Sequence, residues 1–351
     1  MIYIDIEPYR KKKNYFGNRT TVEELYFERI LDKSKNLLDL AELKSFIKKY
    51  TELCNDLASS QSEVVNDLKN GINSSRDEET FFRHLILLPP EKLAKFAKIK
   101  YTEICNDLTT SQSEAFKKAY KILYEPVISK KNNESEIKMN QFLVRELGIT
   151  VCPYCNRNYI NNRGDRFAAQ MDHFYSKDEF PWLAVSLYNL IPSCGACNHI
   201  KGTKALNVHP FIKKNVEENE VVFHYRYKTI DDIEVVISTK KDKHQDIEAI
   251  KKKQRDIEAL NLKEAYEIHG IDIQNMLERE VRYSESYRDE LRDMLKIATV
   301  VQDYDFYLSL TDDEIDRMIY GDVIFEEDIK NVSLGKFRKD IYKEIKKLRN
   351  Y

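Results

Sequence analysis

Residues 152–155 read Cys-Pro-Tyr-Cys, and residues 194–202 read Cys-Gly-Ala-Cys-Asn-His-Ile-Lys-Gly. Two Cys-x-x-Cys pairs supply the four thiolates of a tetrahedral zinc site, and four such ligands leave no position open for catalysis. We therefore predict a structural zinc ion that stabilises a sub-domain too small to fold on its own core. The predicted zinc ligands are Cys152, Cys155, Cys194 and Cys197. A redox role would need a thioredoxin-like βαβ pattern, which the sequence lacks.

The segment between the two pairs carries Asp172-His173 at the end of a predicted strand. Residues 159–162 and 166–174 flank a turn at Gly164, which predicts a β-hairpin whose second strand ends in this pair. Neighbouring strand residues point to opposite faces, so both side chains can serve one site only if the strand end bends or bulges. A histidine can take a proton from water near neutral pH, and a carboxylate suits a hard cation. The pair therefore favours cleavage of a phosphodiester.

Two asparagines frame the second cysteine pair. Asn189 begins the run Asn-Leu-Ile-Pro-Ser that leads to Cys194, and Asn198 directly follows Cys197. The residues from Asn198 onward predict a short helix that Gly202 ends. Because Asn198 is next to a zinc ligand, zinc binding would anchor its position.

Together these features resemble the HNH endonuclease family in its zinc-bound ββα-metal form, over about residues 150–205. The resemblance implies that His173 is the general base and that Asp172 and Asn198 hold one catalytic Mg²⁺ or Mn²⁺. It also implies that Asn189 fixes the loop and orients His173, and that Lys201 is a candidate phosphate contact. Many family members have histidine where this chain has Asn198, and an amide oxygen suits Mg²⁺ better than Zn²⁺.

A longer run is similar to HNH proteins encoded beside ATPases in bacterial anti-phage systems of the Septu type. It extends from Asp172 through Phe180-Pro-Trp to Cys194, while residues 266–269 and 334–341 resemble C-terminal features of that group. This resemblance implies an ATPase subunit as a partner, by analogy alone.

Each candidate also has a structural interpretation. His173 alone could be a satisfied core histidine, and Asn189 could be a turn residue or a helix cap. Over residues 151–210 the six basic residues exceed the four acidic ones by only two, so this core alone should bind DNA weakly. Residues 334–351 hold seven basic and two acidic residues, which fits either a nucleic-acid contact or a solvated helix face.

The flanking regions have mostly helical patterns. In the region of residues 1–145, residues 50–63 recur as residues 101–114, which fits either a paired surface for a partner or a lengthened scaffold. Cys54 and Cys105 in this repeat are interpreted as small buried apolar residues. The nuclease core covers residues 146–212. The region of residues 213–351 is predicted to hold a β-hairpin at about 220–239, followed by charged helices.

Composition limits the possible partners and location. The 351 residues carry a net charge of −2, so nucleic-acid affinity must come from a local patch or from a partner. The sequence contains no apolar run long enough to span a membrane and no recognisable secretion signal, so we expect a cytoplasmic protein.

We therefore expect an α+β, mostly helical protein in which a ββα-metal HNH core with structural zinc lies between helical N- and C-terminal regions. The expected function is metal-dependent hydrolysis of phosphodiester bonds, with DNA as substrate, in prokaryotic defence with an ATPase partner. Two alternatives remain open. One is a zinc-stabilised module that binds nucleic acid or protein without cleaving, and the other is a nuclease for structured RNA such as tRNA.

Overall fold

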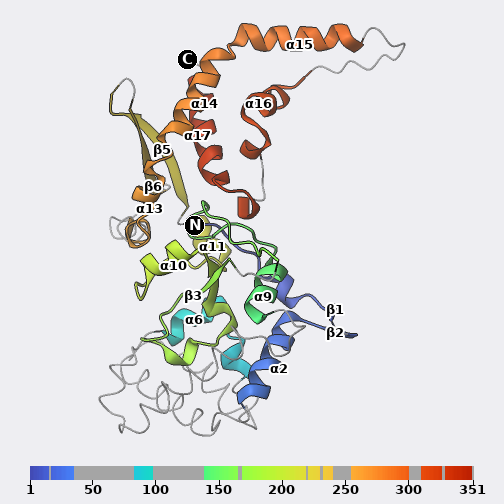
Figure 1. Cartoon of the computed structure of the whole chain (residues 1–351), viewed down its shortest axis with the longest axis vertical. Coiled ribbons are helices and arrows are strands. Elements are labelled where there is room, and N and C mark those ends of the chain that lie inside the picture. Colours follow the sequence, from blue (N-terminus) through green and yellow to red (C-terminus); the bar gives the residue numbers. More distant parts are fainter. Residues whose placement is uncertain are drawn as a thin grey trace. The chain divides into compact units, whose positions relative to one another are not determined.

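The computed structural model describes residues 1–15, 17–34, 83–97, 138–164, 168–218, 220–229, 232–239, 254–299, 310–325 and 329–349. Over these residues the fold is α+β, with helices and two-stranded antiparallel sheets (Figure 1). The chain divides into a core unit of residues 2–154 and 158–217, and a C-terminal unit of residues 155–157 and 218–351 with Met1. The predicted domain boundaries at about 145 and 212 stay predictions. The repeat at residues 50–63 and 101–114, with Cys54 and Cys105, lies outside the described residues.

The N-terminal part of the core unit combines helices with a short hairpin. It contains α1 (Glu7–Arg10), the paired strands β1 (Lys13–Tyr15) and β2 (Asn18–Thr20), and α2 (Val22–Ser34). Helix α2 starts with a capping box, because Glu24 N donates to Thr21 Oγ1 at 3.1 Å and Thr21 N donates to Glu24 Oε2 at 2.9 Å. The β1–β2 hairpin was not predicted, because its strands are short, largely exposed and without apolar alternation.

Two further helices complete this part of the core unit. Helix α6 (Pro90–Phe96) starts with Pro90 in its first turn, where the missing N–H of proline is tolerated. Helix α9 (Met139–Leu147) buries Met139, Leu143 and Leu147 at helical spacing, and Gly148 ends it at φ 62°.

Two strands and a helix form the centre of the core unit. Strand β3 (Gln170–His173) pairs with β4 (Leu190–Ser193), from Gln170 opposite Ser193 to His173 opposite Leu190. The loop between them contains the short 3₁₀ helices η2 (Pro181–Leu183) and η3 (Leu187–Asn189). Strand β4 runs directly into α10 (Gly195–Lys201), which ends as predicted at Gly202, a residue with φ 50°.

The partner of β3 differs from the predicted one. The expected hairpin joined residues 159–162 to 166–174, but residues 158–160 fold back on 150–152 through bonds such as Cys152 N to Asn158 O at 2.9 Å. Every residue of β4 is buried, whereas Tyr159 is 57% exposed. Pairing with β4 therefore places the apolar side chains in the core.

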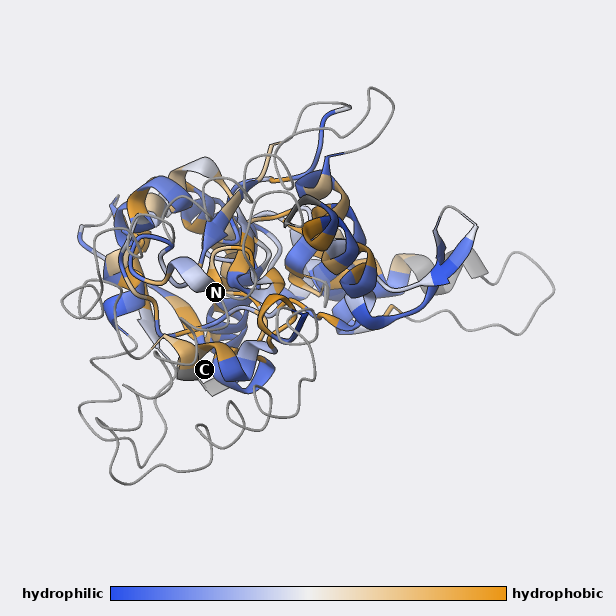
Figure 2. Ribbon diagram, turned by 90° about the horizontal axis from the view of Figure 1, so that it is seen from below, coloured by the Kyte–Doolittle hydropathy of each residue, from blue (hydrophilic) through white to orange (hydrophobic). Residues whose placement is uncertain are grey.

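The C-terminal unit contains the predicted hairpin, formed by β5 (Val221–Tyr227) and β6 (Ile233–Thr239). Phe223 of this hairpin packs on Tyr266 and Phe337, with ring centroids 4.5 and 5.5 Å away. Polar and apolar residues alternate along many of the helices (Figure 2), as expected for elements with one buried face. Among the described helices, none has the length and apolar character needed to cross a membrane. The core unit also contains nearly all of α11 (Lys213–Glu218). The remaining elements of the C-terminal unit are α13 (Leu262–Glu267), α14 (Gly270–Arg282), α15 (Glu285–Thr299), α16 (Asp312–Tyr320), η4 (Asp322–Ile324), η5 (Ile329–Asn331) and α17 (Gly335–Leu348).

Candidate functional site

The four predicted zinc ligands come together. The Sγ atoms of Cys152, Cys155, Cys194 and Cys197 lie within 4.8 Å of one another, and all four residues are buried. A tetrahedron with Zn–S bonds of about 2.3 Å has edges of roughly 3.8 Å, so only a small contraction is needed. Cys197 N and Asn158 Nδ2 donate to Cys194 Sγ at 3.5 and 3.3 Å, as second-layer donors do around thiolate ligands. The donor set and its spacing fit a zinc ion.

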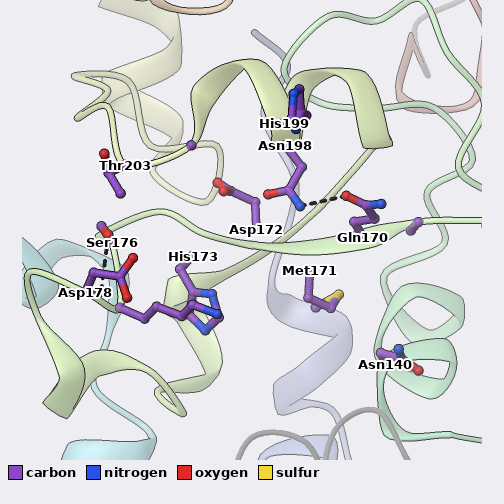
Figure 3. A pocket seen from close by; sticks show the side chains of 13 residues that line it. Asn140, Gln170, Met171, Asp172, His173, Ser176, Asp178, Asn198, His199 and Thr203 are labelled. Carbon is purple, nitrogen blue, oxygen red and sulfur yellow. Dashed lines mark hydrogen bonds between the residues drawn. The ribbon is translucent and has the colours of Figure 1, made fainter. Parts of the chain in front are cut away.

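A pocket of about 580 Å³ lies beside β3 and α10. Its lining includes three of the predicted catalytic residues, Asp172, His173 and Asn198 (Figure 3). Asn189 and Lys201 are not among the lining residues, and both are fully buried. The structure therefore separates the predicted set into residues that face the pocket and residues in the protein interior.

Strand β3 delivers Asp172 and His173 to this pocket without a bulge. The β3–β4 register is continuous from Gln170 to His173, and the two side chains leave the strand on opposite sides (Figure 3). Both border the pocket because the strand ends at His173, so the space beyond the strand end is open to both faces. The expected bend or bulge is therefore not needed.

A backbone carbonyl orients the His173 ring. His173 Nε2 lies 3.0 Å from Ala184 O, and a carbonyl can only accept, so Nε2 carries the proton and Nδ1 is the basic nitrogen. Burial, with a smaller effect from the positive charge of Lys177, outweighs the bond to Ala184 and lowers the pKa of His173 to about 3. The imidazole is therefore neutral at pH 7.

Asn189 holds the loop that provides this carbonyl. Its Nδ2 donates to Leu183 O at 2.9 Å and to Tyr175 O at 3.1 Å, and its Oδ1 accepts from Tyr175 N at 2.8 Å. Leu183 directly precedes Ala184, and Tyr175 lies two residues after His173. One side chain therefore connects the two segments that set the position of the His173 ring.

The N-terminal helices support the same loop from the other side. Tyr26 Oη donates to Val185 O at 2.9 Å, Ser186 Oγ to Leu85 O at 2.9 Å and Trp182 Nε1 to Phe96 O at 3.1 Å. The helical region before residue 145 therefore takes part in positioning the site, a contribution that sequence spacing did not predict.

Asp172 is buried and bound by two donors. Tyr154 Oη donates to its Oδ2 at 2.6 Å, and Lys201 Nζ donates to its Oδ1 at 3.1 Å. Burial raises the pKa of Asp172 and outweighs the opposing effects of the Lys201 charge and of the two hydrogen bonds. Tyr154 was not predicted, although its place inside the first Cys-x-x-Cys pair could have drawn attention to it.

Lys201 lies in the interior rather than at the pocket surface. Besides Asp172, its ammonium group donates to His173 O at 2.7 Å, and its side chain is 0% exposed. Because the amine is fully buried, a phosphate could reach it only if the surrounding side chains moved. The arrangement favours a charge-balancing role for Lys201 over the direct phosphate contact implied by the resemblance.

Asn198 faces Asp172 across the pocket. Its Nδ2 donates to Gln170 Oε1 at 2.7 Å, and its amide oxygen points toward the Asp172 carboxylate (Figure 3). Gln170 is a residue that sequence reasoning missed. It lies two positions before Asp172, and a strand places such residues on the same face.

The C-terminal features noted in the sequence gather inside the C-terminal unit, which includes residues 155–157. Tyr266 Oη donates to Cys155 O at 2.5 Å, Arg157 Nε donates to His269 Nε2 at 3.0 Å, and Lys336 N donates to Asn156 Oδ1 at 2.9 Å. These bonds make the features packing contacts around residues 155–157.

Much of the basic charge in residues 334–351 is paired internally. Lys336 binds Asp340 and Glu220, Lys346 lies near Asp313, and Arg349 binds Asp316. These pairs reduce the positive charge that α17 offers to a nucleic acid.

Comparisons with known proteins give a short similarity. Over 48 residues the chain is 42% identical to the Septu protein PtuB of Bacillus thuringiensis, which covers 14% of this chain and 19% of that protein. The chain thus spans about a fifth of the length of the curated relative it matches. No family model and no solved structure matches the chain.

Proposed function

We propose that this protein is a metal-dependent HNH-type endonuclease that hydrolyses phosphodiester bonds, with DNA as the substrate. The observation that carries the proposal is that Asp172, His173 and Asn198, from two separate elements, line one pocket beside the four-cysteine cluster. The two-strand and helix arrangement of β3, β4 and α10 supports it.

His173 acts as the general base in this proposal. Its Nδ1 takes a proton from a water molecule while Nε2–H stays bound to Ala184 O, so the ring keeps its orientation as the proton moves. The low pKa keeps the ring neutral, and an approaching phosphate group would raise that pKa because a nearby negative charge stabilises the imidazolium.

Asp172 and Asn198 provide oxygen ligands for a divalent ion. A carboxylate and an amide oxygen that face each other suit Mg²⁺ or Mn²⁺, and the ion would neutralise charge on the phosphate. Gln170 keeps the amide of Asn198 turned so that its oxygen faces Asp172. Asn189 and Lys201 act indirectly in this proposal. Asn189 holds the loop that contains Ala184, and Lys201 binds the Asp172 carboxylate.

We also propose a role in prokaryotic anti-phage defence with an ATPase subunit as partner. The short similarity to a protein named for the Septu system supports this step. Substrate choice would then depend on the regions outside the barely basic core, or on the partner.

A second candidate function is a zinc-stabilised module that binds nucleic acid or protein without cleaving it. The buried pair of Asp172 and Lys201 favours this alternative, because a carboxylate already balanced by an internal cation can serve the fold alone.

Cleavage of DNA and of tRNA by the purified zinc-loaded protein, alone and with a co-purified partner, tests the proposal. We expect Mg²⁺- or Mn²⁺-dependent cleavage of DNA that falls by about a hundredfold or more in His173→Ala. His209→Ala removes a buried histidine that does not line the pocket and is the matched control.

Three outcomes would revise the proposal. Cleavage that survives in His173→Ala would remove the base assignment. Cleavage of tRNA but not of DNA would change the substrate class. Binding without cleavage under every condition would favour the second candidate.

A further inference from the structure

We infer that Tyr154 is a positioning residue that sets the affinity of the site for its divalent ion by holding the Asp172 carboxylate. The inference rests on the proposed function, because it takes Asp172 to be a ligand of that ion.

Geometry gives the first argument. The Tyr154 hydroxyl and the Lys201 ammonium each hold a different oxygen of Asp172, at 2.6 and 3.1 Å. A carboxylate has about four acceptor positions, and these two donors use one on each oxygen. The carboxylate plane is therefore fixed, while each oxygen keeps acceptor capacity for a ligand in the pocket that Asp172 lines.

Burial gives the second argument. Tyr154 is 1% exposed and Asp172 is 3% exposed, so water cannot easily replace the hydroxyl if it is removed. Without Tyr154 the carboxylate could turn toward Lys201 or away from Asn198. A metal ligand that must first be ordered binds its ion more weakly.

The position of Tyr154 in the chain gives the third argument. Tyr154 lies in the turn between Cys152 and Cys155, while Lys201 lies four residues after Cys197. Both donors to Asp172 are therefore attached to segments that the cysteine cluster orders. This connection makes the geometry of Asp172 depend on the cysteine cluster as well as on β3.

The test is Tyr154→Phe in the full-length zinc-loaded protein, with Mn²⁺ binding measured directly by electron paramagnetic resonance. We expect the Kd for Mn²⁺ to rise by about tenfold to a hundredfold, the range seen when donors behind metal ligands are removed. In cleavage assays the KM for Mn²⁺ should rise while kcat at saturating Mn²⁺ changes little. Zinc content should stay at its wild-type value.

Tyr9→Phe is the matched control. Tyr9 is equally buried, and its hydroxyl donates to Leu143 O at 3.1 Å, away from the pocket lining. This variant removes the same atom from the same unit, so its Kd for Mn²⁺ should equal that of the wild type. An equal Kd in Tyr154→Phe and Tyr9→Phe would overturn the inference and leave the proposed nuclease function intact.

Two further results separate the possibilities. Wild-type protein that binds no Mn²⁺ would overturn the catalytic ion and this inference together. If Tyr154→Phe loses its zinc, wild-type protein labelled with ¹³C at tyrosine Cζ gives the test instead. Addition of Mg²⁺ should then shift a tyrosine signal, and the absence of any shift would overturn the inference.

Discussion

Asp172 in the core unit and Asp316 in the C-terminal unit are both buried carboxylates that receive a tyrosine hydroxyl and a cation. Asp172 has Tyr154 and Lys201, with one donor on each oxygen. Asp316 has Tyr342 together with Arg288 and Arg349, which place two donors on each oxygen. The first carboxylate lines a pocket, and the second is surrounded by helices α15, α16 and α17.

The pKa values of the two carboxyl groups move in opposite directions. Burial raises the pKa of Asp172 and prevails. Burial also acts to raise the pKa of Asp316, but the hydrogen bonds from Arg349, Tyr342 and Arg288 outweigh it and lower the pKa overall. Asp316, with two internal donors on each oxygen, is a structural centre. Asp172 can still accept further bonds, and its ionisation is costly in a way that an added cation would relieve. Such a combination is expected of a functional site.

Loss of the cysteine cluster should have the largest effect, because it removes the support of only one of these carboxylates. Cys194→Ser should abolish zinc binding, which contributes about 10–16 kcal/mol to the folding of small zinc domains. We expect β3, β4 and α10 to lose hydrogen-exchange protection far more than α16 and α17. Zinc release and hydrogen exchange measured by mass spectrometry check this.

Cys54→Ser is the matched control for that change, since Cys54 is not one of the four predicted zinc ligands. Its zinc content should equal that of the wild type. Full zinc content in Cys194→Ser would contradict the predicted ligand set.

Asp316→Asn should have the next largest effect on stability. It leaves buried Arg288 and partly buried Arg349 with Glu280 as their remaining carboxylate partner, and breaking a buried pair costs about 3–5 kcal/mol. Urea unfolding should report this loss, while the Kd for Mn²⁺ stays unchanged. Asp172→Asn is the contrasting variant and should lose Mn²⁺ binding with a smaller loss of stability. The opposite ranking would mean that Asp172 is the structural carboxylate.

Lowering the pH should reduce the stability of the two units over different pH ranges, and this effect should be smaller than those of the substitutions above. Burial lowers the pKa of His209 to about 3, and its ring packs 4.2 Å from the Phe174 ring in the core unit. Below about pH 6.5 the unfolded chain binds a proton that folded His209 refuses, so stability falls as the pH drops from 6.5 toward 3. At pH 5 this loss is about 2 kcal/mol. The lowered pKa of Asp316 adds a loss of stability in the C-terminal unit that begins near the ordinary pKa of aspartate and continues until the folded carboxylate is protonated.

His209→Gln removes this titration and should reduce the pH dependence of unfolding between pH 6.5 and 5 by about half, because buried His173, whose pKa is also lowered to about 3, contributes a similar slope. Unfolding midpoints in urea at several pH values measure it. An unchanged slope would show that other groups control the acid sensitivity of the core unit.

Features that depend on residues close together in the sequence could be predicted from residue spacing alone. The four cysteines form a cluster as predicted, because two Cys-x-x-Cys turns can each present two thiolates from a few residues. The hairpin of β5 and β6 and the end of α10 at Gly202 also follow from short-range pattern and turn chemistry. The catalytic roles stay proposals, but the expectation that Asp172, His173 and Asn198 share a site is consistent with the pocket they line.

Only the tertiary structure decided which segments meet and which side chains are buried. It paired β3 with β4 rather than with residues 159–162, and it placed Lys201 in the interior against Asp172. It also brought Tyr154 into hydrogen-bond contact with Asp172 and Gln170 into contact with Asn198. The physical reason is that strand partners and buried ion pairs depend on the apolar area and charge of distant segments, whereas cysteine spacing and glycine turns are properties of the local chain.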